Sequence, residues 1–565
     1  MHITILFAKH HRASWALLTA SILWLHGWQA SIAGESVVKE SEASSDVITG
    51  LLFNEDDTEF FSDRNPETVS EADIDAMVDF YADAGVKVFM CAVVGERTSY
   101  DSAVWETYWD DYDPNGPDDQ PRIRNILPEE LDEYRQVLDV FAELDRQGVD
   151  YPARVIQRCR QRGIRPWLSV RMNDCHGLDT NQTPWPSKFM RDHADLARVP
   201  YQQFGRADLA MNHGLVEIRN RYKIVIEEML ERYNMDGLEL DFCRQPLLFA
   251  TGRELEGGKQ LTDWMSQIHE LVVQAEKRHG HSIHLGVRVP SRPETCRNLG
   301  LDVMKWVRED WIDLVVANGC ALATSTDFNT PVAVWRELLR PYGVALAGGI
   351  EPSATSCFLG RGKGLKIKKL DPPLVTGAAT AFLYGGADAV YLFNFFRRSM
   401  PGRHPDWHDE TIREMFTDLN SLETLDSRHR RHIVTYREIT APGELVARRP
   451  IDQPGEISFV DAALPAKGHY GIFRLQTGPK PLGRKVQVVL ELLNSRDSNI
   501  TIRTNGEPCQ LADREADGDL LRFDVPEKAL ADEAHVIEVY SDAKRGPPFT
   551  ITWVEMDIAA KEPKD

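Results

Sequence analysis

The stretch Asp236-Gly237-Leu238-Glu239-Leu240-Asp241-Phe242 alternates apolar and acidic side chains, directly after an amphipathic segment at residues 215–233. Successive side chains of a β-strand point to opposite faces. A strand here therefore turns its apolar residues toward one face and both Glu239 and Asp241 toward the other. Because an amphipathic helix followed by a short strand is the repeating unit of a parallel sheet, the stretch predicts a βα fold with two carboxylates on one side of that sheet.

The same alternation of short apolar runs and longer amphipathic segments continues on both sides of this stretch. The first expected helix begins at Ser70, whose side chain suits an N-cap. Repeats of this kind predict an α/β fold, a (β/α)8 TIM barrel at residues 47–426. No Gly-rich phosphate-binding sequence follows an early run, which argues against a dinucleotide-binding fold. The expected strands are residues 47–54, 86–94, 165–173, 237–242, 282–289, 312–318, 344–350 and 387–393.

The pattern changes beyond about Ser427. Short runs of strand-forming residues recur there, separated by Gly, Pro, Asn and Asp. Residues 427–565 are therefore predicted to form a smaller all-β, sandwich-like accessory domain. Few aromatic residues are expected on its surface, which favours bracing of the barrel over polysaccharide binding, and both roles stay open. The expected strands are residues 432–436, 470–475, 486–493, 500–504, 520–525, 535–540 and 550–556.

The N-terminus has the features of an export signal. Basic residues from Lys9 to Arg12 precede an apolar run, and Ser31-Ile32-Ala33 offers small residues to a signal peptidase. We expect residues 1–33 to be a signal peptide and 34–46 a linker. The mature protein is then secreted or periplasmic and has no stable transmembrane span. A short, uncleaved membrane anchor is the alternative.

Charge and cysteine usage limit the partners and cofactors. The 65 Lys and Arg against 87 Asp and Glu give a net charge of −22, so nucleic acid is not an expected partner. The 8 cysteines show no C-x-x-C spacing, and neither a zinc site nor a set of disulfides is indicated. Cys243 is interpreted as a packing residue. We expect no cofactor; the alternative is calcium at Asp111, Asp113 and Asn115, which copy the start of a calcium loop although Arg122 stands where its Glu should be.

The active site of a TIM barrel lies at the C-terminal ends of its strands. Strand parity directs Arg171, Asn173 and Arg288 into the interior beside Glu239 and Asp241, where buried charges must pair. One interpretation of this set is a structural ion cluster. The other is a catalytic site in which the cations keep Asp241 ionised while another carboxylic acid stays protonated.

Glu351 ends the seventh strand run and is the preferred partner of Asp241, with Glu239 as the alternative. These three residues are the catalytic candidates, because a sugar must lie between two carboxylates. Glu55, Glu96 and Asp174 follow the first three strands and are weaker candidates. Aromatic rings of an acidic loop at residues 105–121 suit the faces of sugars. The expected substrate-binding residues are Arg171, Asn173, Asp174, His176, Arg244, Arg288, Asn318, Asn394, Trp105 and Trp109. Several arginines near the mouth leave an anionic sugar open.

The central stretch also carries a resemblance. With the segment His213-Gly214-Leu215-Val216-Glu217-Ile218-Arg219 before it and Arg244 after it, it resembles the fourth-strand signature of (β/α)8-barrel glycoside hydrolases, most closely the family-10-like glycosyl hydrolases. In that family a His-x-x-Val-Arg helix leads into Asp-Gly-Ile-x-x-Asp, and Arg171-Met172-Asn173-Asp174 is similar to its polar third-strand end. The resemblance covers residues 46–396 and implies a barrel that cleaves glycosidic bonds.

Together these observations predict an exported glycoside hydrolase that degrades a polysaccharide or oligosaccharide with two carboxylates. A carbohydrate-binding protein that retains the barrel without catalysis is the alternative. A metal-dependent hydrolase is disfavoured, because the sequence lacks the histidine pairs that such sites need.

Overall fold

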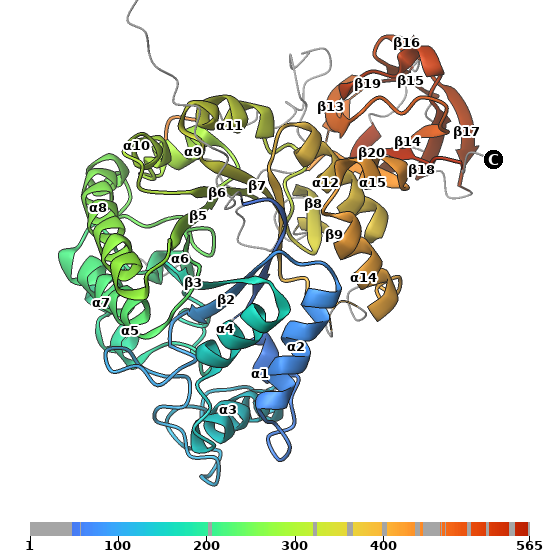
Figure 1. The fold of residues 1–565 in the computed structure, drawn as a ribbon. Coiled ribbons are helices and arrows are strands. Elements are labelled where there is room, and N and C mark those ends of the chain that lie inside the picture. The colour runs from blue at the N-terminus through green and yellow to red at the C-terminus, as the bar shows by residue number, and fades with distance from the viewer. Residues whose placement is uncertain are drawn as a thin grey trace, which may run out of the picture. The chain divides into compact units, whose positions relative to one another are not determined.

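In a computed structural model of the protein, residues 48–562 are described, except for 57, 202–205, 320–324, 359–364, 398–399, 401–403, 436–440, 445–463, 465, 469, 494–498, 516–518 and 542–548. Eight parallel strands close into a barrel in the order β1-β10-β7-β6-β5-β4-β3-β2 (Figure 1). The predicted TIM barrel is confirmed. Its strands are β1 (Gly50–Glu55), β2 (Val88–Val94), β3 (Arg165–Arg171), β4 (Gly237–Asp241), β5 (His284–Pro290), β6 (Leu314–Asn318), β7 (Ala345–Ile350) and β10 (Ala389–Phe393).

Strand parity sorts the barrel side chains into two cores. Leu238, Leu240 and Phe242 belong to the large core under the helices, as the alternation predicts. A smaller cluster, which includes Trp167 and Tyr391, fills the barrel interior. Gly237 makes room for the Trp167 ring, since a Cβ at this position would lie 2.2 Å from a ring atom.

The helices surround the strands (Figure 1). Both helical segments named in the sequence analysis are present: α7 corresponds to residues 215–233, and α2 begins after Ser70, which forms a capping box with Asp73. The longer helices are α2 (Glu71–Asp83), α3 (Leu131–Arg146), α4 (Tyr151–Arg162), α7 (Val216–Arg232), α8 (Glu254–His279), α11 (Val332–Leu339), α12 (Pro372–Tyr384) and α14 (Asp409–Asp418). The shorter ones are α1 (Glu59–Ser62), α5 (Lys188–Asp192), α6 (Arg206–Leu209), α9 (Pro293–Asn298), α10 (Val303–Arg308) and α15 (Leu422–Ser427). A hairpin that sequence analysis did not foresee, β8 (Ser353–Phe358) and β9 (Leu365–Lys369), follows β7.

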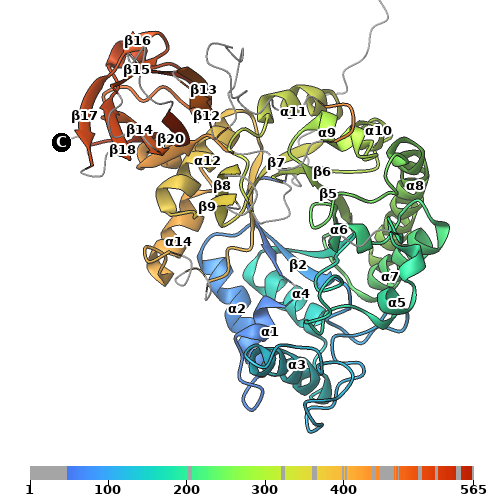
Figure 2. The same ribbon diagram turned by 180° about the vertical axis from the view of Figure 1, so that it is seen from behind.

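The C-terminal strands form two antiparallel sheets, as predicted (Figure 2). Residues of both sheets, such as Val488 and Phe473, belong to one buried cluster, so the sheets pack face to face as a sandwich. One sheet contains β11 (Arg430–Ile433), β12 (Ala466–Gly468), β14 (Val486–Leu493), β17 (Gln510–Arg514), β18 (Leu520–Asp524) and β20 (Phe549–Ile558). The other contains β13 (Tyr470–Gly478), β15 (Ile500–Thr504), β16 (Glu507–Pro508) and β19 (Glu533–Ser541).

The sandwich contacts the barrel through α12 and the β8–β9 hairpin. Lys366 and Lys368 of β9 both form ion pairs with Glu491 of β14. Gly377 of α12 lies so close to β11 that a Cβ would approach the Arg431 carbonyl oxygen to 2.0 Å. These contacts are of the kind that a bracing domain makes.

No helix among the described residues is long and apolar enough to span a membrane. The expected signal peptide and linker, residues 1–46, lie outside the described residues. Export and the domain boundaries stay predictions.

Candidate active site

Asp241 and Glu351 share one guanidinium group at the mouth of the barrel. Arg288 of β5 places Nη1 2.9 Å from Asp241 Oδ2 and Nη2 2.7 Å from Glu351 Oε1. Asn318, at the end of β6, donates to the same Glu351 oxygen at 2.7 Å. All of these side chains are buried, with Asp241 at 1 % and Glu351 at 4 % exposure. We call Asp241, Arg288 and Glu351 the buried ion triad.

Cys243 helps to hold the triad. Its backbone N–H donates to Asp241 Oδ1 at 2.8 Å. Cys243 is also disulfide-bonded, a constraint that its sequence context did not indicate. The Phe393 ring lies under the Arg288 guanidinium, 3.7 Å from its centre, and so supports it by a cation–π contact.

Glu239 lies deeper in the barrel than Asp241 and has a different set of partners. Its Oε2 accepts hydrogen bonds from Asn54 at 2.9 Å, Ser169 at 2.6 Å and Tyr391 at 3.2 Å. Burial and the nearby charge of Asp241 raise the pKa of Glu239 to about 7. Burial also raises the pKa of Glu351 above its ordinary value, although Arg288 and Arg244 act in the opposite direction. These two acids are therefore easier to protonate than acids in water.

Arg171 points inward as predicted, but its partners differ from those expected. It forms ion pairs with Asp56, just after β1, and with Asp174, which lies three residues further along the chain than Arg171. The expected pairing with Glu239 or Asp241 does not occur, because the loops after β1 and β3 bring their own carboxylates to this guanidinium. Among the described residues, Arg288 is the arginine that forms an ion pair with a β4 carboxylate, Asp241.

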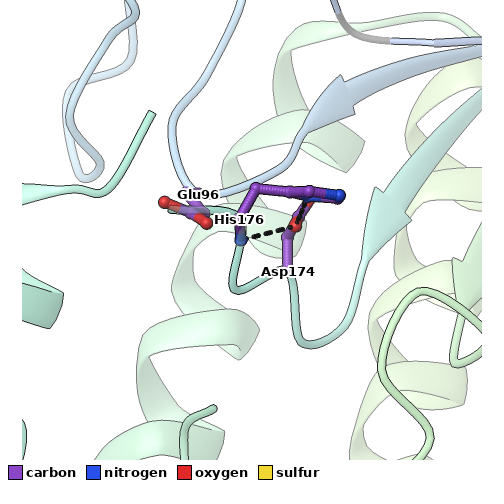
Figure 3. Close-up of side chains that lie close together, drawn as sticks. All are labelled: Glu96, Asp174 and His176. Atoms are coloured by element: carbon purple, nitrogen blue, oxygen red, sulfur yellow. Dashed lines mark hydrogen bonds and ion pairs between the residues drawn. The ribbon is translucent and has the colours of Figure 1, made fainter. Parts of the chain in front are cut away.

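Asp174 and His176 form a second group at the end of β3 (Figure 3). His176 Nδ1 hydrogen-bonds Asp174 Oδ1, and Arg244 Nη2 lies 2.9 Å from His176 Nε2. Burial by itself raises the pKa of Asp174, but His176, Arg171 and Arg244 together hold it well below its usual range. Asp174 is therefore a carboxylate over the whole neutral range.

These residues line a cavity of about 130 Å³ at the ends of β1 to β4, which we call the side cavity. Its polar wall contains acids, arginines and a histidine, and its aromatic wall consists of Tyr108 and Trp185. Arg122 positions the aromatic wall by donating to the backbone oxygens of Tyr108 and Pro184, each at 2.9 Å. The full lining is Asp56, Thr58, Glu96, Tyr108, Arg171, Asp174, His176, Trp185 and Arg244.

Three of the lining residues had no place in the sequence prediction: Asp56, Thr58 and Trp185. Trp185 lies in the long loop after β3, for which the sequence gives no periodic pattern. Trp185 begins a Trp-Pro-Ser sequence directly before α5, and this is the feature of the sequence that could have drawn attention to it.

The remaining predicted substrate-binding residues lie apart from the side cavity. Asn173 is buried and exchanges two hydrogen bonds with the Met211 backbone, at 3.0 and 3.1 Å. Trp105 is 8 % exposed and is covered by Arg221, 3.9 Å from its ring centre. Trp109 packs on Phe141. Asn394, after β10, is 8 % exposed and has a positive φ of 61°. Direct sugar contact by these residues stays a prediction.

Glu96, Asp174 and His176 place ligand-type atoms within 4.8 Å of one another, a spacing that a divalent cation could bridge. Both ring nitrogens of His176 already have hydrogen-bond partners, and two guanidinium groups adjoin the cluster. Positive charge at this position opposes a cation. In the acidic loop, Asp113 Oδ1 accepts from the Asn115 backbone and Arg135 pairs with Asp118, while calcium at Asp111, Asp113 and Asn115 stays a prediction.

No family model and no curated protein matches the sequence. Among solved structures, α-L-fucosidase isoenzyme 2 from Paenibacillus thiaminolyticus is 11 % identical over 67 % of this chain and 50 % of that chain, with a TM-score of 0.39. The GH36 α-galactosidase AgaB from Geobacillus stearothermophilus is 10 % identical over 87 % and 55 %, with a TM-score of 0.33. The maltogenic α-amylase AmyB from Thermotoga neapolitana is 8 % identical over 86 % and 98 %, with a TM-score of 0.36. The chain thus spans about half the length of the first two, and at such identities and TM-scores these likenesses assign neither a family nor an activity.

Proposed function

We propose that the protein is an exported glycoside hydrolase that cleaves a polysaccharide or oligosaccharide with two carboxylates. The observation that carries the proposal is the pairing of Asp241 and Glu351 on one guanidinium group at the C-terminal end of the barrel. Barrel enzymes perform their chemistry at this end. The side cavity, with its aromatic and acidic walls, adds a place for a sugar ring beside the pair.

The environments of the two carboxyl groups assign them different roles. We assign Asp241 the role of nucleophile or base, because Arg288 and the Cys243 backbone N–H hold its two oxygens in place at the mouth of the barrel. Burial raises the pKa of Glu351, which suits the acid that protonates the leaving oxygen. Burial and the charge of Asp241 also raise the pKa of Glu239, to about 7, but Glu239 lies below the pair, so it is the second choice as acid.

Both carboxylates are buried, and a substrate must displace the side chains above them. Arg288 is the group that has to yield, because it occupies the space between Asp241 and Glu351. Arg244 reaches from the side cavity toward this pair and lies 5.4 Å from the Phe393 ring that also supports Arg288. A sugar bound in the side cavity is therefore adjacent to the triad.

The test is the release of reducing ends from neutral, uronic and sulfated polysaccharides. We expect the mature protein to release them and both Asp241→Asn and Glu351→Gln to lose at least about a hundredfold in rate, the lower range for general acid–base groups. Glu337→Gln removes an exposed carboxylate on α11 and should retain full rate. Equal rates for Asp241→Asn and the wild type would contradict the assignment.

A carbohydrate-binding protein without catalysis is the second candidate. It is favoured by the burial of Asp241 and Glu351 against Arg288, whereas the side cavity is lined by groups that bind sugars. Binding of a polymer without cleavage, unchanged in Asp241→Asn but weakened in Trp185→Ala, would support this candidate over the hydrolase.

A further inference from the structure

Three arginines stand at the barrel mouth, and their partners differ. Arg288 has two carboxylates, Asp241 and Glu351. Arg171 has Asp174 and Asp56. Arg244 forms no ion pair with a carboxylate among the described residues, and its polar contact is with His176 Nε2 at 2.9 Å.

The position of Arg244 makes this difference significant. Its side chain lines the side cavity and is partly buried, and its Nε is buried without a hydrogen-bond partner in the described part of the chain. A guanidinium withdrawn from water loses hydration that only an anion or several acceptors can replace. Two acids of the cavity, Asp56 and Asp174, are already paired with Arg171.

We propose that Arg244, oriented by His176, binds the anionic group of an acidic sugar in the side cavity. Guanidinium groups bind planar carboxylates and sulfates through several N–H donors, and Arg244 lines the side cavity with its Nη2 placed by His176. Tyr108 and Trp185 cover the ring of the sugar, and Asp56 and Glu96 accept from its hydroxyls. The inference deepens the proposed function by naming its substrate class, and it rests on that function only in taking the ligand to be a sugar.

His176 is a positioning residue in this arrangement. Its Nδ1–H donates to Asp174, which leaves Nε2 as the acceptor that holds Arg244. The same contact argues against a cation at Glu96, Asp174 and His176, since a metal would have to displace a guanidinium.

The experiment is isothermal titration calorimetry of the full mature chain with glucuronate, glucose 6-sulfate and glucose. We expect at least one of the anionic sugars to bind roughly tenfold or more tightly than glucose, as a charge-assisted hydrogen bond permits. Glucuronate and glucose 6-sulfate separate a carboxylate site from a sulfate site. Arg244→Gln should abolish the preference, and Arg253→Gln should retain it, because Arg253 is an exposed arginine on the same β4–α8 connection and forms an ion pair with Glu256 on the surface.

Arg244→Lys is the second variant and guards against a folding defect in Arg244→Gln. It keeps the charge without the paired donors, so we expect it to retain part of the preference, and that part should weaken as ionic strength rises. Equal binding of anionic and neutral sugars, no binding of any of them, or a preference unaffected in Arg244→Gln would overturn the proposal. The proposal would also be overturned if the protein showed no preference for anionic sugars but bound Mn²⁺ or Ca²⁺, and if Glu96→Gln abolished that metal binding.

Failure of this inference and failure of the proposed function are distinguishable. If the protein cleaved only neutral polymers, the proposed hydrolase activity would be supported and the proposed anionic subsite would be contradicted. If the protein preferred anionic sugars through Arg244 but cleaved no polymer, the proposed subsite would be supported and the proposed hydrolase activity would be contradicted.

Discussion

Replacing Glu239 by Gln should stabilise the barrel at alkaline pH. Glu239 Oε2 accepts three hydrogen bonds, whereas Oε1 is buried with no hydrogen-bond partner among the described residues. A glutamine can keep its carbonyl oxygen at the Oε2 position and place its NH₂ at the Oε1 position. The substitution therefore removes the charge and keeps the shape.

The size of the effect follows from the pKa. A rise from 4.5 to about 7 corresponds to roughly 3 kcal/mol of lost stability once the carboxyl is ionised in both states. Because the folded pKa is raised, the folded chain binds the proton more tightly. Its stabilising contribution is present below about pH 4.5 and is lost as the pH rises through about 7. The glutamine has no such dependence.

Urea unfolding at about pH 5 and about pH 8.5 measures this difference. We expect the unfolding free energy of Glu239→Gln, taken relative to the wild type, to increase by roughly 3 kcal/mol between the two conditions. Glu217→Gln is the control, because this exposed side chain stays in water in both states. A relative stability that does not change with pH would refute the reasoning and show that Glu239 ionises at the same pH in both states.

The other predictions concern packing, acid stability and the domain contact. Gly237→Ala would bring a Cβ to 2.2 Å from the Trp167 ring, so we expect a loss of about 1–3 kcal/mol in urea unfolding, and wild-type stability would mean that the ring can move aside. Burial lowers the pKa of His213 to about 4. Between about pH 6.5 and 4 the histidine is therefore protonated in the unfolded chain and neutral in the folded chain, so the free energy of unfolding decreases as the pH falls through this range. His213→Gln should flatten that fall in an acid unfolding series, and an unchanged slope would contradict it. Glu491→Gln removes the shared partner of Lys366 and Lys368, so amide exchange in β9 should become several-fold faster, while an unchanged rate would show that α12 alone holds the contact.

Much of the fold could be predicted because the deciding pattern is local. The alternation in 236–242 depends only on neighbouring residues, and it correctly placed Leu238 under the helices and Glu239 and Asp241 inside. The same parity correctly turned Arg288 toward Asp241. The β8–β9 hairpin was missed because it inserts into the connection between β7 and α12, where a regular (β/α)8 repeat has a helix directly after the strand.

The partners of the site residues lie in loops, and the sequence of a loop has no periodic pattern from which side-chain positions can be predicted. Parity directed Arg171 inward, but the chain after β1 brings Asp56 to it and the turn after β3 brings Asp174. Trp185 reaches the side cavity because Arg122, expected to mark a defective calcium loop, binds the backbone of both connecting segments. Such long-range contacts leave no local pattern in the sequence.

Glu239 and Asp241 show how two carboxyl groups on one strand face acquire different partners. They stand two positions apart on β4, yet neutral donors surround Glu239 and a cation with a backbone N–H surrounds Asp241. Neutral donors do not offset the cost of burying a charge, so Glu239 holds its proton to about pH 7. Asp241 is instead held at both oxygens, by the Arg288 guanidinium and by the Cys243 backbone N–H. Under the proposed function, Asp241 and Glu351 flank Arg288 at the mouth of the barrel, and Glu239 lies one layer below them as the second choice of acid.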